Sequence, residues 1–256
     1  MGVLAAERIK LTSTRSPWWC AALTAVFAVG IAALLSLMLN TSPEETTGDN
    51  TLAGVGITGL AQGMPGFGYL MIMILAVLAV TSEYRFGTIK TTFLATPNRA
   101  LVLTAKAGLI GVSAAVLSGV LTFLSWFVLK GMLNSRTAEG LSLSGDLRTF
   151  YAVPIFVLLV VFLSVGVGAL IRQSAGALSL LLLWPVVLEP MAAFFGNVGR
   201  NIQVFLPFQN AGRFLGTVED GSQPWHWGQW GALAYFAAFV AIVFAAALFV
   251  VNKRDA

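Results

Sequence analysis

The sequence has few charged residues. Asp, Glu, Lys and Arg together make up 10% of its 256 residues, whereas they make up about a quarter of an average soluble globular domain. Hydrophobic residues make up 57%. So low a charge content excludes an ordinary soluble domain and indicates an integral membrane protein.

Cysteine and histidine are almost absent: Cys20 and His226 are the only residues of their kinds. An intrachain disulfide needs a second cysteine. Metal centres and nucleophile–base pairs need several such side chains close together. We therefore predict no metal site and no catalytic residue, and interpret Cys20 as a small buried residue and His226 as a polar residue at the membrane interface.

The dipeptide Gly-Lys does not occur in the chain. A P-loop requires Gly-Lys followed by Ser or Thr, because its backbone and lysine hold the phosphates of ATP. The chain cannot hydrolyse ATP by that route, so we expect it to be no enzyme and to hold no cofactor itself.

Six apolar runs are long enough to cross about 30 Å of hydrocarbon at about 1.5 Å per helical residue. Their one side chain that is normally charged at neutral pH is Glu189. The predicted fold is an all-α polytopic membrane protein with one transmembrane domain over residues 1–256. Its predicted spans are residues 17–39, 64–82, 107–129, 150–171, 174–195 and 230–251.

Basic residues are concentrated in alternate connecting segments. With the N-terminus inside, the inner segments carry ten of the fifteen Lys and Arg residues, and the outer segments carry seven of the eleven acidic residues. Short cytoplasmic segments are enriched in Lys and Arg, so both termini are predicted to be cytoplasmic. The same asymmetry accounts for the net charge of +4, and we therefore predict no nucleic-acid binding.

Residues 1–16 mix apolar residues with Arg8, Lys10 and Arg15 ahead of Pro17. Basic and apolar residues together suit the headgroup boundary, which predicts a short interfacial helix. The alternative is an unstructured basic tail that only sets topology.

The outer segment, residues 196–229, alternates apolar and polar stretches and ends in Trp225, Trp227 and Trp230. A plain loop has no need of so much apolar surface. Two short re-entrant helices around Pro207 would pair the backbone polar groups at membrane depth and place the tryptophans at the interface.

Glu189 lies near the outer end of the fifth span, where Pro185 and Pro190 favour kinks. An ionisable side chain within a span is a candidate functional residue. The alternative is a glutamate at headgroup depth, hydrogen-bonded to a neighbouring helix or to the backbone freed by Pro190.

The inner segment, residues 83–106, is the compact charged stretch of the chain. If residues 86–95 are helical, one stripe of that helix is apolar, with Lys90 beside it. Pro97 would end the helix, and Arg99 would mark the return to the membrane. One face could dock into an apolar groove; the alternative is a loop whose charges only enforce topology. The stripe consists of Phe86, Ile89 and Phe93.

Two stretches of this segment, Ser82-Glu-Tyr-Arg-Phe-Gly-Thr-Ile-Lys90 and Phe93-Leu-Ala-Thr-Pro-Asn-Arg99, resemble the pattern of ABC-2-type ABC transporter permeases. The N-terminal Glu7-Arg-Ile-Lys-Leu-Thr-Ser-Thr-Arg-Ser-Pro-Trp18 resembles the start of actinobacterial members. Six spans and a long outer segment between the fifth and sixth agree with the family, so the resemblance covers essentially the whole chain.

The resemblance implies a multi-pass permease of the bacterial plasma membrane. It would pair with a second copy or a related permease, contact membrane lipid, and bind two cytoplasmic ATP-binding subunits that hold ATP and Mg²⁺. We expect an exporter of a small amphipathic compound, lipid or peptide. The residues that match the family's ATPase-coupling motif are Glu83, Arg85, Gly87, Thr88 and Ile89, with Phe93 and Pro97 in its coupling helix and Leu206 and Pro207 at the junction of its re-entrant helices.

Two other functional classes remain open. An ion-coupled secondary carrier normally has several intramembrane acids or broken helices repeated in two halves, and this chain has one such acid and no obvious repeat. The second class is a non-transporting membrane scaffold or signalling partner, and no residue of the sequence excludes it.

Overall fold

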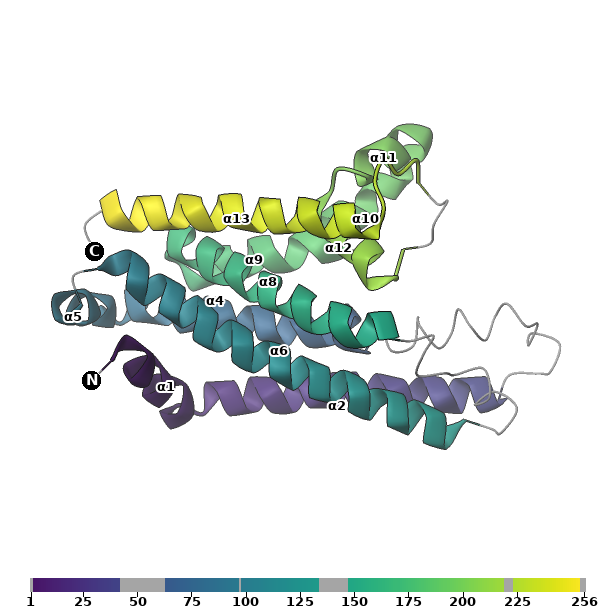
Figure 1. Ribbon diagram of the computed structural model, residues 1–256, viewed down its shortest axis with the longest axis horizontal. Coiled ribbons are helices and arrows are strands. Elements are labelled where there is room, and N and C mark those ends of the chain that lie inside the picture. Colours follow the sequence, from purple (N-terminus) through teal and green to yellow (C-terminus); the bar gives the residue numbers. More distant parts are fainter. Residues whose placement is uncertain (1, 42–62, 97, 134–146, 219–222, 254–256) are drawn as a thin grey trace.

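The computed structural model describes residues 2–41, 63–96, 98–133, 147–218 and 223–253. Within these residues the secondary structure is helical, and six helices are long and apolar enough to cross a membrane. The predicted all-α fold with six spans is thereby confirmed. Both ends of the chain lie at the same end of the bundle, next to the short helix α5 (Figure 1).

The order of elements follows the prediction closely. The helix α1 (Val3–Ser13) precedes α2 (Ser16–Thr41), and the π-helical turn η2 (Gly63–Gly68) leads into α4 (Tyr69–Arg85). Next come α5 (Thr88–Ala95), α6 (Arg99–Met132) and α8 (Leu147–Ile171). The fifth span consists of α9 (Ser174–Leu183), η3 (Trp184–Leu188), α10 (Glu189–Met191) and η4 (Ala192–Phe195), followed by α11 (Gly196–Gln203), α12 (Pro207–Leu215) and α13 (Gln229–Lys253).

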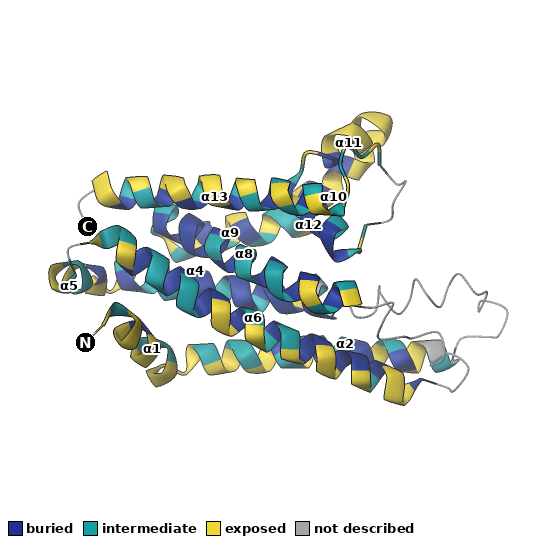
Figure 2. Cartoon of the chain, viewed as in Figure 1, coloured by how far each residue is buried: buried dark blue, intermediate teal, exposed yellow. Residues whose placement is uncertain are grey.

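Helix α8 is the centre of the bundle. It contacts α4, α6 and α13, and most of its residues are buried (Figure 2). A Cβ atom at Gly166 would lie 3.4 Å from the Cα of Phe244, and one at Gly168 would lie 3.5 Å from the carbonyl oxygen of Val77. Small residues therefore bring α8 close to α13 and α4, which is the usual way to pack helices when lipid supplies no hydrophobic force between them.

The outward surface of the bundle is apolar. Val112, Val116 and Val120 form an exposed row along α6, and Val26 and Leu34 are exposed on α2. Contiguous apolar surface of this kind is rare on soluble monomers and is what contact with hydrocarbon requires. The architecture is that of a membrane-embedded multi-pass protein.

The N-terminal segment is helical, so the alternative of an unstructured tail is wrong. Helix α1 ends at Ser13, where Thr14 is extended with a ψ of 149°. Pro17 then lies in the first turn of α2, a position at which its missing N–H is not needed by the helix.

The predicted coupling loop, residues 83–106, is mostly helical. Glu83 lies in the last turn of α4, and α6 begins at Arg99 instead of at residue 107. Asn98 fixes that start, because its side-chain oxygen accepts a hydrogen bond of 3.0 Å from the backbone N–H of Leu101. The short helix α5 fills the space between, and Pro97 lies outside the described residues.

The fifth span is irregular, as its two prolines predicted. Pro185 lies in the π-helical η3, and the helix tightens to 3₁₀ geometry over η4. Gly196 then turns the chain with a φ of 58°, in the left-handed region that favours glycine. Irregular turns of this kind commonly mark proline and functional positions within helices.

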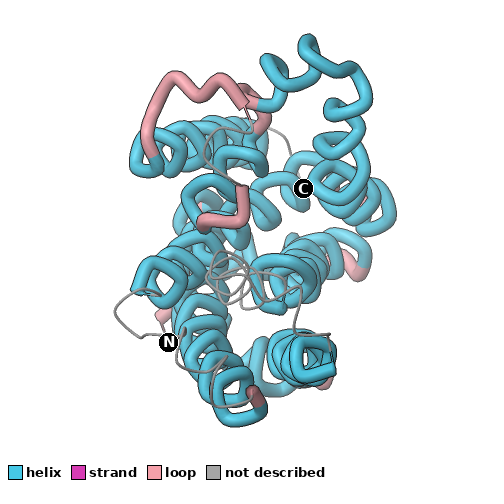
Figure 3. The backbone as a smooth tube through the Cα atoms, turned by 90° about the vertical axis from the view of Figure 1, so that its right-hand side faces the viewer, coloured by secondary structure: helices cyan, strands magenta, loops and turns pink. Residues whose placement is uncertain are grey.

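The end of the bundle opposite α5 carries α10, α11 and α12. Two short helices are present where the sequence predicted them, with Pro207 as the first residue of the second. Helix α12 contacts α8 and α13. Figure 3, viewed from this end, shows the long helices end-on and the short helix α11 standing away from the bundle.

Candidate functional site

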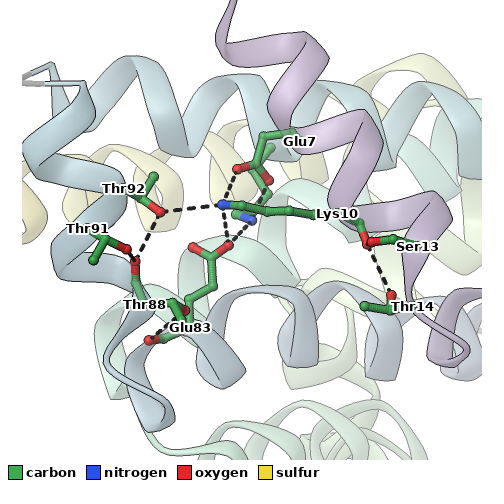
Figure 4. Close-up of polar contacts among 9 residues, drawn as sticks. Glu7, Lys10, Ser13, Thr14, Glu83, Thr88, Thr91 and Thr92 are labelled. Carbon is green, nitrogen blue, oxygen red and sulfur yellow. Dashed lines mark hydrogen bonds and ion pairs between the residues drawn. The ribbon is translucent and has the colours of Figure 1, made fainter. Parts of the chain in front are cut away.

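Four charged side chains meet at the base of α5 (Figure 4). Lys10 of α1 lies 2.8 Å from a carboxylate oxygen of Glu7 and 2.8 Å from one of Glu83. Lys106 of α6 lies 2.5 Å from the other oxygen of Glu7 and 2.9 Å from Glu83 of α4. These four residues, which we call the ion cluster, connect α1 to α4 and α6, which lie more than 70 residues further along the chain.

Three of the four residues of the ion cluster are buried. Glu7 is 3% exposed, Glu83 8% and Lys106 4%, whereas the Lys10 side chain is 41% exposed. Taking charges out of water is costly, and buried ion pairs persist only when each charge has partners. The ion cluster meets that condition, because its two lysines and two carboxylates carry equal numbers of positive and negative charges and each contacts an opposite charge.

The ionisation of the α1 residues follows from these contacts. Burial raises the pKa of the Glu7 carboxyl, but the neighbouring Lys106 and Lys10 outweigh it and hold this pKa below its ordinary value of 4.5. Burial lowers the pKa of Lys10, but hydrogen bonds to Glu7 and Glu83 outweigh it and raise this pKa above 10.5. Both groups are therefore charged across the physiological range.

Helix α5 is attached to the ion cluster. The Nζ of Lys10 lies 3.4 Å from the hydroxyl of Thr92, and the hydroxyl of Thr88 lies 3.5 Å from the backbone oxygen of Glu83. Gly87 joins α4 to α5 with a φ of 71°, in the left-handed region where a side chain would be strained. The turn therefore depends on the glycine that the sequence motif contains.

The apolar stripe predicted over Phe86, Ile89 and Phe93 is wrong at its first residue, because Phe86 lies before α5 and is exposed, while the other two face the protein itself. Ile89 is buried, and Phe93 is half-buried against the core. The Arg99 guanidinium lies 5.2 Å from the centre of the Phe93 ring and donates a hydrogen bond of 3.3 Å to the carbonyl of Val251 in α13. Ile89 and Phe93 thus anchor α5 to the bundle.

A different set of residues points outward at this end of the bundle. Phe86 is 72% exposed and Leu94 84%, and Lys90 lies between them in the sequence and is exposed as well. We call these three residues, Phe86 at the C-terminal cap of α4 with Lys90 and Leu94 of α5, the α5 outer face. Other predicted residues that are exposed here are Arg8, Arg15, Arg85, Gly87 and Thr88.

Sequence reasoning missed two members of the ion cluster. No contact is predicted from the sequence for Glu7 in the basic N-terminal segment or for Lys106 at the end of the inner segment, residues 83–106. A signal was present for each: Glu7 lies three residues before Lys10, a spacing that places both on one helix face, and Lys106 lies in an otherwise apolar run.

Glu189 forms a second polar site, near α12. One carboxylate oxygen accepts hydrogen bonds of 2.9 Å from the Nε1 of Trp184 and from the backbone N–H of Phe208. The other accepts one of 2.7 Å from the N–H of Gln209. Glu189 is 1% exposed, so a buried carboxylate caps the N-terminal turn of α12, where unpaired N–H groups and the helix dipole favour negative charge.

The junction at Leu206 and Pro207 is held by one buried amide. The Nδ2 of Asn210 donates to the carbonyl oxygens of Val204 and Leu206 at 2.7 and 2.9 Å. The Oδ1 of Asn210 accepts a hydrogen bond of 2.8 Å from the Nε1 of Trp227. Together with the Glu189 cap, these contacts fix the position of α12.

Among the residues that the structure describes, no group of His, Cys, Asp or Glu is arranged to hold a metal ion. Comparison with models of known protein families and with curated proteins gives no match.

Proposed function

We propose that this chain is the permease half of an ABC transporter of the ABC-2 type, driven by a separate ATP-binding subunit that holds ATP and Mg²⁺. Its activity would be the export of a small amphipathic compound, lipid or peptide across a bacterial plasma membrane. A second copy or a related permease would complete the transport unit.

The ion cluster is the observation that carries this proposal. It fastens α1 to α4 and α6 through contacts of 2.5 to 2.9 Å, and α5 is attached to it by the hydroxyls of Thr88 and Thr92 at 3.5 and 3.4 Å. Packed elements that move as one body transmit a displacement, whereas a loosely tethered loop absorbs it. A force applied to α5 would therefore reach the ends of two spanning helices.

The position and charge of α5 also support the proposal. Helix α5 lies at the end of the bundle that carries both termini (Figure 1). The basic residues of α1, α5 and the beginning of α6 gather there, as is typical of the cytoplasmic side. The α5 outer face offers two exposed apolar side chains and one cation, which suits a hydrophobic groove with an acidic edge on a soluble partner.

Copurification tests the proposed partnership. The full chain, tagged at its C-terminus, is coexpressed with an ABC-2-type ATP-binding subunit of its own organism and purified in mild detergent. We expect a stable complex with the wild type and loss of the subunit with Leu94→Asp, because a buried charge replaces an apolar anchor. Leu147→Asp is the matched control, since Leu147 is exposed at the first turn of α8. Wild-type chain that retains no ATP-binding subunit would contradict the proposal.

A further inference from the structure

An apolar cavity of about 370 Å³ lies where α1 meets α2, α4 and α6. It begins at α1, at the end of the bundle that carries both termini (Figure 1). Along α6 it extends from Leu109 to Leu117, which is about 12 Å at about 1.5 Å per residue. One leaflet of hydrocarbon is about 15 Å thick, half of a core of about 30 Å. The cavity is therefore long enough for most of an acyl chain that lies along α6.

The hydroxyl groups in the wall of the cavity are bonded to their own helices. The hydroxyl of Thr24 donates a hydrogen bond of 2.8 Å to the carbonyl oxygen of Cys20. The hydroxyl of Ser113 lies 2.8 and 3.0 Å from the carbonyl oxygens of Leu109 and Ile110. Neither hydroxyl needs a partner inside the cavity, so the interior mainly offers apolar contacts, which suit a hydrocarbon chain.

Two unused hydrogen-bond donors lie at the rim of the cavity. Arg8 and Trp18 both line it, and both side chains are exposed. Within the residues that the structure describes, neither the guanidinium of Arg8 nor the indole N–H of Trp18 has a hydrogen bond or an ion pair. A guanidinium presents a planar fork of N–H groups that matches a phosphate, and tryptophan typically places its N–H at headgroup depth.

The charges near the cavity favour an anionic headgroup that carries no cation. Its lining, as far as the chain is described, includes no Asp or Glu. Glu7, the neighbour of Arg8 in the sequence, accepts from Lys10 through one carboxylate oxygen and from Lys106 through the other. A headgroup ammonium would therefore find no counterion at the rim and would be repelled by Arg8.

We propose that the apolar cavity binds an anionic phospholipid of the leaflet on the side of the termini. The lipid phosphate accepts hydrogen bonds from Arg8 and Trp18, and one acyl chain lies in the cavity along α6. Phosphatidylglycerol has the required headgroup, whereas choline and ethanolamine headgroups add an ammonium. The site requires nothing of the proposed transport function and would exist in a scaffold as well.

Native mass spectrometry of the full chain in mild detergent measures the binding of the first lipid. The delipidated chain is titrated with phosphatidylglycerol or with phosphatidylcholine of the same acyl chains. We expect phosphatidylglycerol to bind about tenfold more tightly, because the choline cation offsets the attraction between the phosphate and Arg8. Equal affinities for the two lipids would overturn the proposal.

A pair of charge variants tests the headgroup contact. Arg8→Gln should abolish the preference for phosphatidylglycerol. Arg15→Gln is the matched control, since Arg15 is an exposed cation at the junction of α1 and α2 that does not line the cavity, and it should keep the preference. An equal loss in both variants would mean that the basic surface attracts anionic lipid without a site, and would overturn the proposal.

A pair of size variants tests the acyl chain. Ser113→Trp fills the cavity from an exposed position without changing any charge, and should weaken phosphatidylglycerol binding about tenfold or more. Val116→Trp, at an exposed position of α6 outside the cavity, should bind as wild type. Unchanged affinity in Ser113→Trp would overturn the proposal.

A soluble anion separates a lipid site from a phosphate site. Glycerol 3-phosphate has the phosphate and no acyl chain, so we expect it to leave bound phosphatidylglycerol in place at millimolar concentration. Displacement of the lipid by glycerol 3-phosphate would assign the rim to a soluble phosphate compound and would contradict a phospholipid site.

Discussion

Lys106 of α6 and Glu83 of α4 form a buried ion pair of 2.9 Å at the base of α5. Lys106 also contacts Glu7 of α1, so one ammonium group holds three helices together. Removing it leaves two buried carboxylates with Lys10 as their remaining basic partner in the cluster. The loss of this ammonium group can be measured as a loss of folding stability, because removing one member of a buried ion pair leaves the other charge buried and uncompensated.

The substitution Lys106→Met keeps much of the aliphatic volume and removes the charge. We expect it to lower the free energy of unfolding by about 3 to 5 kcal/mol, measured by denaturant titration in detergent. Lys90→Met is the control, because Lys90 is exposed on α5 and surface substitutions change stability by about 0.5 kcal/mol or less. Equal stability of the two variants would show that the ion cluster contributes nothing.

The double variant Glu83→Gln with Lys106→Met should be more stable than the sum of its single variants predicts. It removes one charge of each sign and leaves Glu7 paired with Lys10 at 2.8 Å. Residues in one such network typically show coupling energies of about 0.5 to 3 kcal/mol. Strict additivity of the two losses would argue against a shared cluster. Lys106→Met combined with Lys90→Met supplies the additive reference.

Stability should depend on pH through the ion cluster. The pKa of Glu7 is lower in the folded protein than its ordinary 4.5, so its contribution is present above pH 4.5 and is lost as the pH falls through the folded pKa. The pKa of Lys10 is raised above 10.5, so its contribution is present below that pH and is lost as the pH rises through the folded pKa. Thermal melts between these limits should give a plateau.

Single variants separate the two limbs of that profile. Glu7→Gln should reduce the acid loss relative to wild type, and Lys10→Met should reduce the alkaline loss while keeping the Glu7–Lys106 contact. A wild-type acid limb that is unchanged by Glu7→Gln would mean that other carboxyl groups produce it.

Glu189→Leu should loosen the start of α12. The substitution leaves the N–H groups of Phe208 and Gln209 without their acceptor, and each buried unsatisfied donor costs about 1 to 3 kcal/mol. We expect amide hydrogen exchange at these two residues to accelerate about tenfold or more. Glu189→Gln retains one acceptor oxygen and should lie between the variant and wild type.

A neighbouring substitution controls for general disturbance of the fifth span. Leu188 is exposed on η3, and Leu188→Ala should leave the exchange of Phe208 and Gln209 unchanged. Unchanged exchange in Glu189→Leu would show that the carboxylate does not hold α12. A role of this buried acid in transport would then be the remaining hypothesis.

The six spanning helices could be predicted from the sequence because length and apolarity are local properties. The ion cluster could not, since Glu7 and Lys106 meet only when α1 folds back against α6, and no local pattern fixes that contact. Glu189 shows the same limit: its place in an apolar run was readable, but its partners besides Trp184 are backbone N–H groups of a helix that begins at Pro207.

Helix α5 shows a further limit of periodicity. The stripe of Phe86, Ile89 and Phe93 predicted an amphipathic helix over residues 86–95, and a helix is present over Thr88–Ala95, with Phe86 outside it. Periodicity identifies an apolar face, but it does not say whether that face packs on the chain's own core or on a partner. The structure buries Ile89 and leaves Phe86 and Leu94 exposed, so the proposed contact with a partner moves to the α5 outer face.

The most direct test of the proposed function is the ATP turnover of the ATP-binding subunit that copurifies with the chain, measured in proteoliposomes with and without the chain. We predict that the wild-type chain stimulates turnover and that the double variant Phe86→Asp with Leu94→Asp does not, while Leu147→Asp behaves as wild type. Turnover that is the same with and without the wild-type chain would contradict the assignment of this protein as an ATP-driven permease.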